Sequence, residues 1–472
     1  MPRHLFRART IWLFAFCYTA AVSLIFQRAV LPLLPALNAG HGLLKNDAYF
    51  YHQSAVRVAE NIRLHGWSAW APWSRLTETT GNVGVLSALY ALFSPHPALV
   101  IPVNAFLHAT SAALLFMIGR ELWPGRTGNL SGLLVAALFV FFPSALSWYS
   151  QPLKDTYAIA GILMIGYAHT LTLREVGERK DLLRAFVWMA LGVFLITFVK
   201  PYYLKLLLVS IALVLLLLAA QGIWMKRWQP LRVWSFYMLA GVFMALVATA
   251  VKPYVPAAEN GKVYAASTIG KKISTATNKS WEWKAVPWLP RSVDRNLELA
   301  ARTRAGLISY NQKVGAGSLI DAGAAPQSAG QLLEYLPRAL QVGLFAPFPD
   351  TWMRKAGVTW LLAVAETMCW YLLVPGIFLA FYRCRSPRLT VTALFAVFFI
   401  VVFSFVTPNI GSLYRYRYAY EFLLMSIAAG GWIEWFLGHR SRDGGLATSH
   451  FGYAREGDLV EPAPAKIGTG KP

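Results

Sequence analysis

Two acidic residues are the first candidates for chemistry in this chain. Asp47 stands in a polar stretch, residues 45–66, that directly follows the first long apolar segment. Asp155 follows Lys154 at the end of a later apolar segment. Two carboxylates on one surface can divide the work of a reaction. One accepts a proton from an attacking hydroxyl group, and the other holds that hydroxyl or a cation in place.

Each carboxylate also has a purely structural explanation. Apolar side chains recur after Asp47 at spacings of three and four, so Asp47 could cap a helix by accepting a hydrogen bond from a backbone N–H. Lys154 and Asp155 could be neighbouring charges at a membrane boundary. Both explanations stay open on the sequence alone. His52, about one helical turn after Asp47, is the histidine most worth testing as a ligand.

Cationic residues lie near other segment ends. Arg415 and Arg417 stand among tyrosines shortly before the last apolar segment, and Lys200 stands at a similar boundary. Arginine presents a planar fork that matches phosphate oxygens, so these residues predict a phosphate site, with Lys200 as a third cation. Anchoring in lipid headgroups is the alternative for the arginines.

Arg338 lies in an aromatic, proline-rich segment that could cover a lipid chain or lie at the membrane interface.

The composition places these residues in a membrane protein. Of 472 residues, 56% are hydrophobic and 14% charged, and the apolar runs are too long for a soluble core. The three cysteines lie in or beside these runs, so the sequence offers no disulfide framework. Ten spans are predicted, at about 11–33, 98–119, 129–148, 156–173, 185–200, 203–224, 233–251, 357–381, 389–407 and 418–437.

The loops give the predicted orientation. Lys and Arg gather in alternate short loops, which puts both termini in the cytoplasm and places Asp47 and Asp155 on the same outer surface. Much of the formal charge of +22 lies in these loops, so nucleic-acid binding is not the natural inference. The apolar residues 82–94 are predicted to be re-entrant or interfacial, because counting them as a span would put the basic loop 120–128 outside.

The predicted organisation has four parts. Residues 1–251 form a transmembrane module with a first outer loop at 34–97, and residues 252–356 form a small, mainly helical outer subdomain. Residues 357–440 supply the last transmembrane helices, and 441–472 form a disordered cytoplasmic tail. The loop 252–356 holds 14 Lys and Arg against 7 Asp and Glu, which suits an anionic substrate or the anionic face of the bilayer.

This layout resembles the GT-C superfamily of glycosyltransferases over most of residues 1–437. The marks are Asn46-Asp47 before a predicted interfacial helix, Lys154-Asp155 in the second outer loop, and Arg415-Tyr-Arg417. The layout is most similar to the bacterial branch related to protein mannosyltransferases and lipid A sugar transferases. The resemblance implies that Asp47 is the base or acceptor-orienting group and Asp155 the second acid. The family's first motif is a paired acid, whereas Asn46 precedes Asp47 here, so the division of labour and any divalent metal stay open.

The resemblance also implies a reaction and a location. A sugar would pass with inversion from a polyprenyl-phosphate donor to a glycan, lipid or protein acceptor, while Arg415, Arg417 and Lys200 neutralise the departing phosphate. The site would face outward from a bacterial cytoplasmic membrane. No zinc, phosphate-loop or dinucleotide motif is present, so the sequence itself requires no cofactor.

Two other functions remain open. An O-antigen-type polymerase or ligase would use a pyrophosphate-linked oligosaccharide. A non-enzymatic lipid or glycan transporter would have ionisable groups deep within its spans, and the sequence shows few of these.

Overall fold

The computed structural model describes residues 7–70, 80–174, 178–226, 228–250, 281–353 and 357–443. In these ranges the regular structure is helical, with isolated β-bridges but no strand, as the all-α prediction requires. One compact unit covers Met1–Glu434 and a second covers Trp435–Pro472. The described part of the second unit is the end of helix α18 (Ile410–Asp443), and the predicted tail lies almost wholly outside the described residues.

Seven helical segments in the described part of the chain are long and apolar enough to cross a membrane. The first two are Ala8–Leu33, made of α1 (Ala8–Ile25), η1 (Phe26–Val30) and η2 (Leu31–Leu33), and Pro97–Leu122, made of η4 (Pro97–Val100) and α4 (Ile101–Leu122). Three single helices follow: α8 (Arg179–Val199), α9 (Tyr203–Met225) and α10 (Leu231–Ala250). The last two are Trp360–Arg383, which lies in α15 (Val358–Leu373) and α16 (Pro375–Arg383), and α17 (Pro387–Val406). Helices α5 (Gly125–Phe141) and α6 (Pro143–Tyr149), bent by 60°, add an eighth if they form one span. The multi-pass membrane prediction is therefore supported, but the predicted count of ten is not reproduced.

The difference in count comes from helices that are less apolar than the others. The predicted spans 156–173 and 418–437 fall on α7 (Asp155–Thr172) and α18, which are helical but are not among the eight. Almost every residue of α7 is buried, including the polar His169 and Thr170. A helix enclosed by other helices can carry polar side chains because its neighbours, rather than lipid, surround them. Hydropathy alone is therefore a poor measure of where such a helix lies.

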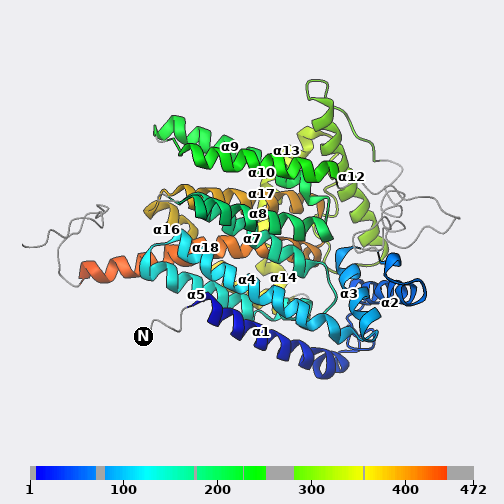
Figure 1. Ribbon diagram of the computed structural model, residues 1–472. Coiled ribbons are helices and arrows are strands. Elements are labelled where there is room, and N and C mark those ends of the chain that lie inside the picture. The colour runs from blue at the N-terminus through cyan, green and yellow to red at the C-terminus, as the bar shows by residue number, and fades with distance from the viewer. Residues whose placement is uncertain are drawn as a thin grey trace, which may run out of the picture. The chain divides into compact units, whose positions relative to one another are not determined.

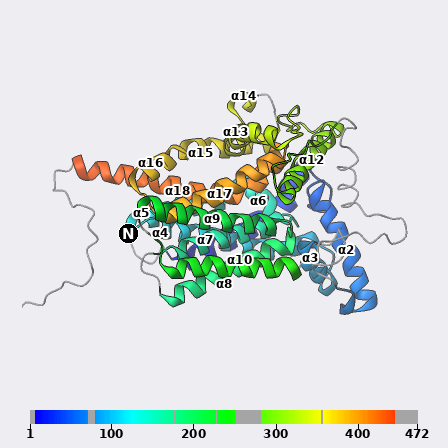
Figure 2. The ribbon, with the colours of Figure 1, turned by 90° about the horizontal axis from the view of Figure 1, so that it is seen from above.

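The first predicted outer loop contains two helices that pack on each other. Helix α2 (Asp47–His65) buries Ala48, Tyr51 and Ala55 on one face, and these side chains pack with α3 (Gly81–Leu92) in one apolar cluster. The short η3 (Trp67–Ala69) follows α2. At 12 residues, α3 is about 18 Å long, well short of the roughly 30 Å of a bilayer core. Residues 82–94 thus do not form a span. Figures 1 and 2 show α2 and α3 at one end of the long helices of the first unit.

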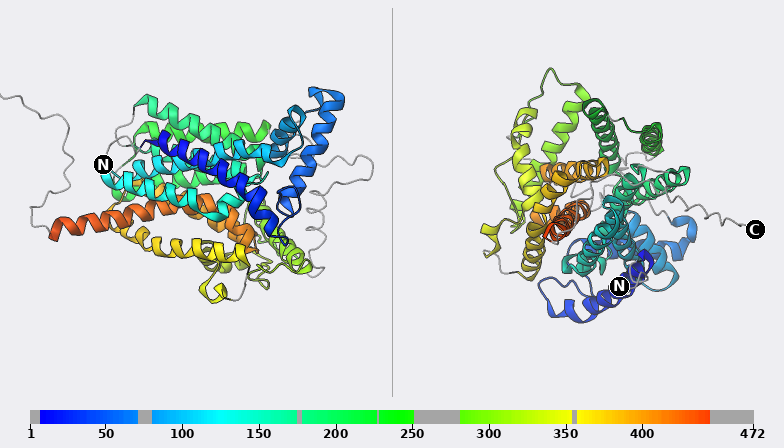
Figure 3. Two further views of the ribbon diagram at one scale, coloured as in Figure 1. Left: turned by 90° about the horizontal axis from the view of Figure 1, so that it is seen from below. Right: turned by 90° about the vertical axis from the view of Figure 1, so that its left-hand side faces the viewer.

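The described part of the long polar loop is also helical. It forms α12 (Arg291–Lys313), α13 (Ala329–Phe345) and the short α14 (Pro349–Trp352). Arg304 of α12 donates hydrogen bonds to the carbonyl oxygens of Ser404 and Phe405 at the end of α17. Residues 281–353 therefore belong to the same compact unit as the long helices. Figure 3 shows α2 and the green α12 toward the same end of these helices.

Helices α4 and α5 approach closely because glycines line their contact. A Cβ atom added at Gly132 would lie 2.5 Å from the carbonyl oxygen of Phe116, and one added at Gly119 would lie 2.5 Å from the Cα atom of Gly132. Small residues of this kind let helix backbones come together in membrane proteins. Gly241 in α10 offers a contrast, because a Cβ atom added there would lie no closer than 3.8 Å to any neighbouring atom.

We expect Gly132→Ala to destabilise the protein by about 1 to 3 kcal/mol, because the new methyl group forces α4 and α5 apart. Gly241→Ala is the matched control: it makes the same change in a helix where there is room, and it should leave stability unchanged or slightly higher. The measurement is the midpoint of thermal unfolding of both purified variants in detergent. Equal midpoints for the two variants would contradict this packing of α4 on α5.

Candidate functional site

Five charged residues that the sequence singled out lie together, and we call them the charge cluster: Asp47, Lys154, Asp155, Lys200 and Arg415. Arg415 lies between the two acids. Its Nη1 and Nη2 donate to Oδ2 of Asp47 at 3.2 and 3.1 Å, and its Nη1 lies 3.4 Å from Oδ2 of Asp155. Nζ of Lys200 donates to the other oxygen of Asp155 at 2.7 Å.

Helix ends bring these residues together. Asp47 is the first residue of α2 and Asp155 the first of α7, where a carboxylate is favoured by the positive end of the helix dipole. Lys200 directly follows α8, which ends there because Pro201 comes next. Arg415 lies in the second turn of α18. The cluster thus depends on four separate helices.

The charge cluster has a buried inner pair and an accessible outer pair. The side chains of Lys200 and Asp155 are 2% and 5% exposed, whereas those of Arg415 and Asp47 are 23% and 54% exposed. A buried charge requires a partner, and besides Asp155 the Nζ of Lys200 lies 4.4 Å from the ring centre of Tyr416 and 5.5 Å from that of Tyr203. The outer pair and the half-buried Lys154 are open to a ligand.

The capping explanation of Asp47 does not fit the structure. Helix α2 begins at Asp47, so Asn46 holds the capping position, with φ of 70° and no hydrogen bond from its side chain to the helix. The partner of the Asp47 carboxylate is instead Arg415, on a helix near the other end of the chain. The contact between α2 and α18 therefore accounts for this carboxylate better than the start of α2 does.

Arg417 is not part of the charge cluster. Its side chain is 1% exposed, its Nε lies 3.2 Å from Glu421, and its Nη1 donates to the carbonyl oxygen of Gly343 at 2.8 Å. The last span was predicted to begin at residue 418, after both arginines, but α18 already begins at Ile410 and contains them. Residues two apart in a helix point roughly 200° apart, so the two arginines do not form the predicted pair.

His52 and Arg338 also make contacts elsewhere. Nδ1 of His52 lies 2.7 Å from the hydroxyl oxygen of Tyr90, which joins α2 to α3, and burial together with His41 and His96 lowers the pKa of His52. Arg338 forms two hydrogen bonds of 3.0 Å to Asp321.

Asp321 is held in its charged form. Burial raises its pKa, but the hydrogen bonds from Arg338 and Tyr335 outweigh this effect, so the pKa lies below its usual value. This pair holds the segment after α12 against α13.

Sequence reasoning missed several polar residues around the charge cluster. Tyr51 of α2 is buried beneath Lys154, whose Nζ lies 5.8 Å from its ring centre. Burial and the nearby Asp47 and Asp155 raise the pKa of Tyr51, so it stays a neutral phenol.

A second missed feature is Glu366, buried in α15. It accepts hydrogen bonds from the backbone N–H of Ser144 at 2.8 Å and from the hydroxyl of Tyr414 at 2.5 Å. The signal was a lone acid within an apolar run, which usually marks a functional or structural polar contact.

The described residues contain no group of three or more His, Cys, Asp or Glu side chains that could hold a metal ion. Both carboxylates of the charge cluster contact cationic side chains instead.

Comparison with known proteins gives no family for this chain. No protein-family model matches it, and no curated protein is significantly similar to it in sequence. A function for this chain can therefore be inferred only from its site.

The inner pair of the charge cluster yields a prediction about stability. Lys200→Met leaves Asp155 buried with only the longer contact to Arg415, and removing one partner of a buried ion pair costs roughly 3 to 5 kcal/mol. We expect a marked fall in the midpoint of thermal unfolding for Lys200→Met. Adding Asp155→Asn should recover part of the loss, because no uncompensated charge then remains. Strictly additive losses in the double variant would show that the two side chains do not interact.

Proposed function

We propose that this chain is an integral-membrane glycosyltransferase of the GT-C type, which moves a sugar from a polyprenyl-phosphate donor to a glycan, lipid or protein acceptor. The observation that carries the proposal is the outer pair of the charge cluster. An accessible carboxylate, Asp47, is held by an accessible guanidinium, Arg415, at one end of a bundle of apolar helices. A lipid-linked phosphate and an acceptor hydroxyl would need these two groups side by side.

Asp47 is the proposed base. Its carboxylate is the most exposed acid of the charge cluster, and Arg415 fixes its position through Oδ2. In the proposed step, Asp47 takes the proton from the acceptor hydroxyl as the oxygen attacks the anomeric carbon of the donor sugar. The bond from that carbon to the phosphate oxygen breaks at the same time, and the phosphate leaves with the electron pair.

Arg415 and Lys154 are the proposed phosphate-binding groups. A guanidinium has five N–H donors, and the hydrogen bonds of Arg415 to Asp47 and Asp155 involve only its two terminal nitrogens. Remaining N–H groups can bind phosphate oxygens and stabilise the charge that grows on the leaving group. The charge cluster holds three cations and two carboxylates, so its net charge favours an anionic donor.

Asp155 and Lys200 are proposed to position the outer pair. At 5% exposure the Asp155 side chain has little access to an acceptor, but its Oδ2 faces Arg415 while Lys200 holds its Oδ1. Asp155 would therefore orient the guanidinium rather than accept a proton from substrate. This differs from a reaction in which both acids contact the substrate directly.

The proposed location is a bacterial cytoplasmic membrane, with both termini inside and the charge cluster facing outward. The distribution of Lys and Arg among the short loops supports this orientation. Helices α2, α3 and α12, which lie toward one end of the long helices, would then form the outer face (Figure 1).

One observation favours a second candidate, a transporter of lipids or glycans. Glu366 and Glu421 are buried ionisable groups within predicted spans, where transporters place proton or ion sites, and Glu421 pairs with the buried Arg417 just before its span. A polymerase or ligase that uses a pyrophosphate-linked donor would fit the charge cluster as well, and it would use Asp47 as a base in the same way. The transporter gives Asp47 no role beyond its charge.

We expect Asp47→Asn to abolish transfer while changing stability by only about 1 kcal/mol, because an exposed ion pair contributes little to folding. Glu60→Gln is the matched control, since it makes the same acid-to-amide change at an exposed position of α2. The measurement is incorporation of labelled sugar in membranes of a deletion strain that expresses each variant at equal level. Wild-type incorporation by the Asp47 variant would reject its role as the base.

The two arginines of α18 should behave differently on substitution by lysine. Arg415→Lys keeps the charge but loses the fork, and the loss of one charge-assisted contact of roughly 1.5 to 3 kcal/mol should weaken binding of undecaprenyl phosphate about ten- to a hundredfold. Arg417→Lys should lower the unfolding temperature, because its side chain is buried against Glu421, but leave the affinity of the folded protein unchanged. Native mass spectrometry in detergent measures both affinities. Equal affinity of wild type and Arg415→Lys would remove Arg415 from the phosphate site.

A further inference from the structure

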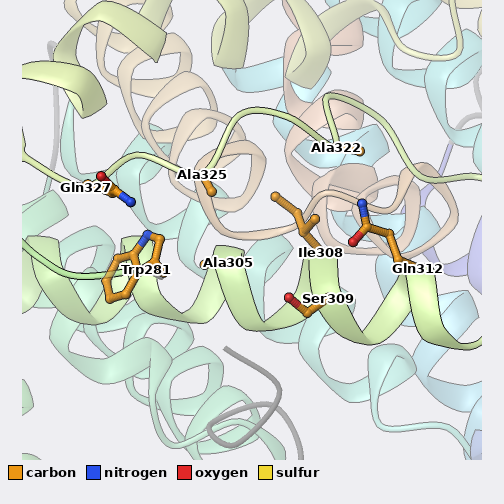
Figure 4. A pocket seen from close by; sticks show the side chains of 8 residues that line it. All are labelled: Trp281, Ala305, Ile308, Ser309, Gln312, Ala322, Ala325 and Gln327. Atoms are coloured by element: carbon orange, nitrogen blue, oxygen red, sulfur yellow. The ribbon is translucent and has the colours of Figure 1, made fainter. Parts of the chain in front are cut away.

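A pocket of about 270 Å³ lies in the described part of the long loop, and it shares no residue with the charge cluster. One wall is a face of α12, where Ile308, Ser309 and Gln312 are spaced so that they line one side of the helix. The opposite wall is the segment 322–327. Figure 4 shows Trp281 and Gln327 at one end of the pocket and Gln312 at the other.

The lining combines an aromatic surface with neutral polar groups. Trp281 is held in place by a hydrogen bond of 3.1 Å from its indole N–H to the carbonyl oxygen of Pro326. Ser309, Gln312 and Gln327 supply a hydroxyl and two amides, and their side chains make no hydrogen bond within the described parts of the chain. None of the lining side chains is charged, and the guanidinium of Arg302, outside the lining, lies 5.7 Å from the ring centre of Trp281. The pocket therefore suits a neutral ligand that is both apolar and rich in hydrogen-bonding groups.

A sugar ring matches this lining. Each hydroxyl group both donates and accepts hydrogen bonds, as do the side-chain amides of Gln312 and Gln327. The C–H groups of the ring form a flat apolar face that can lie against an indole. The volume falls below the roughly 300 to 1,000 Å³ of sites for larger ligands, so it suits one ring rather than an oligosaccharide.

The wall of the pocket is also tied to the helix that carries Arg415. The backbone N–H of Ile320 donates to Pro408 at 2.8 Å, and that of Ile410 donates to Ser318 at 2.9 Å. Ile410 is the first residue of α18, and Arg415 lies in the next turn. A ligand in the pocket is thus held by a segment fixed to the start of the helix that supplies the proposed phosphate-binding arginine.

We propose that this pocket binds one uncharged sugar residue of the acceptor glycan. The assignment to the acceptor rests on the proposed glycosyltransferase function, whereas the sugar-binding chemistry rests on the pocket alone. The pocket would fix an acceptor sugar other than the one that reacts, and the chain of the glycan would extend from it toward Asp47.

The test is saturation-transfer NMR with the full chain in lipid nanodiscs, since the headgroups of maltoside detergents would compete for the pocket. The probes are glucose, galactose, mannose and N-acetylglucosamine, with glucuronate as the charged comparison. Wild type should bind at least one neutral sugar more strongly than glucuronate. Gln312→Ala should weaken that binding roughly two- to tenfold, as expected for one lost neutral hydrogen bond, and Ser309→Leu should abolish it by filling the pocket. Ser292→Leu, the same change at an exposed position of α12, is the control and should bind like wild type.

The outcomes separate this inference from the proposed function. Asp47→Asn should bind the sugar like wild type whether or not it transfers sugar, and undecaprenyl phosphate should not displace the sugar. Absence of binding to every neutral probe, or equal binding by wild type and Ser309→Leu, overturns the sugar site. Displacement by undecaprenyl phosphate would overturn its assignment to the acceptor.

Discussion

The contact of Arg415 with two carboxylates is the interaction on which the rest of this site depends. Asp47 and Asp155 begin two different helices, and Arg415 comes from a third, so one guanidinium connects α2, α7 and α18. Lys200 adds α8 by holding the far oxygen of Asp155. Without Arg415, the accessible acid Asp47 would lose its fixed position beside the helix bundle.

Burial divides these charges into two kinds. The Asp155–Lys200 pair is shielded from solvent, and such pairs seldom stabilise a fold more than well-packed apolar side chains would. The pair would then serve to orient Arg415. Lys200 holds one oxygen of the buried carboxylate, so the other oxygen faces Arg415 in a defined direction. The outer pair is open to solvent and adds little to stability, so under the proposed function it would be free to exchange partners on binding a phosphate.

Much of this cluster could be predicted from the sequence, because the Lys and Arg content of the loops indicates which segment ends lie on the same side of the membrane. Asp47, Asp155, Lys200 and Arg415 all lie at segment ends that the Lys and Arg distribution assigns to one surface, and the structure brings them into contact. Arg417 could not be placed in the same way, because its direction depends on where α18 begins. The spacing of four residues between Arg417 and Glu421 was visible, yet only the helix start at Ile410 makes them a buried pair. The span count failed at α7 for a related reason, since hydropathy averages a segment without knowing what surrounds it.

The most direct test of this account is the set of lipid-linked sugars that accumulates when the gene is deleted, measured by mass spectrometry of the extracted lipids. A glycosyltransferase of the proposed type predicts that a single sugar joined to a polyprenyl lipid through one phosphate accumulates, because the enzyme that consumes it is gone, and that the wild-type gene removes it. Accumulation of an oligosaccharide joined through pyrophosphate would instead indicate a polymerase or ligase. An unchanged lipid pool would contradict the proposed glycosyltransferase and favour a transporter.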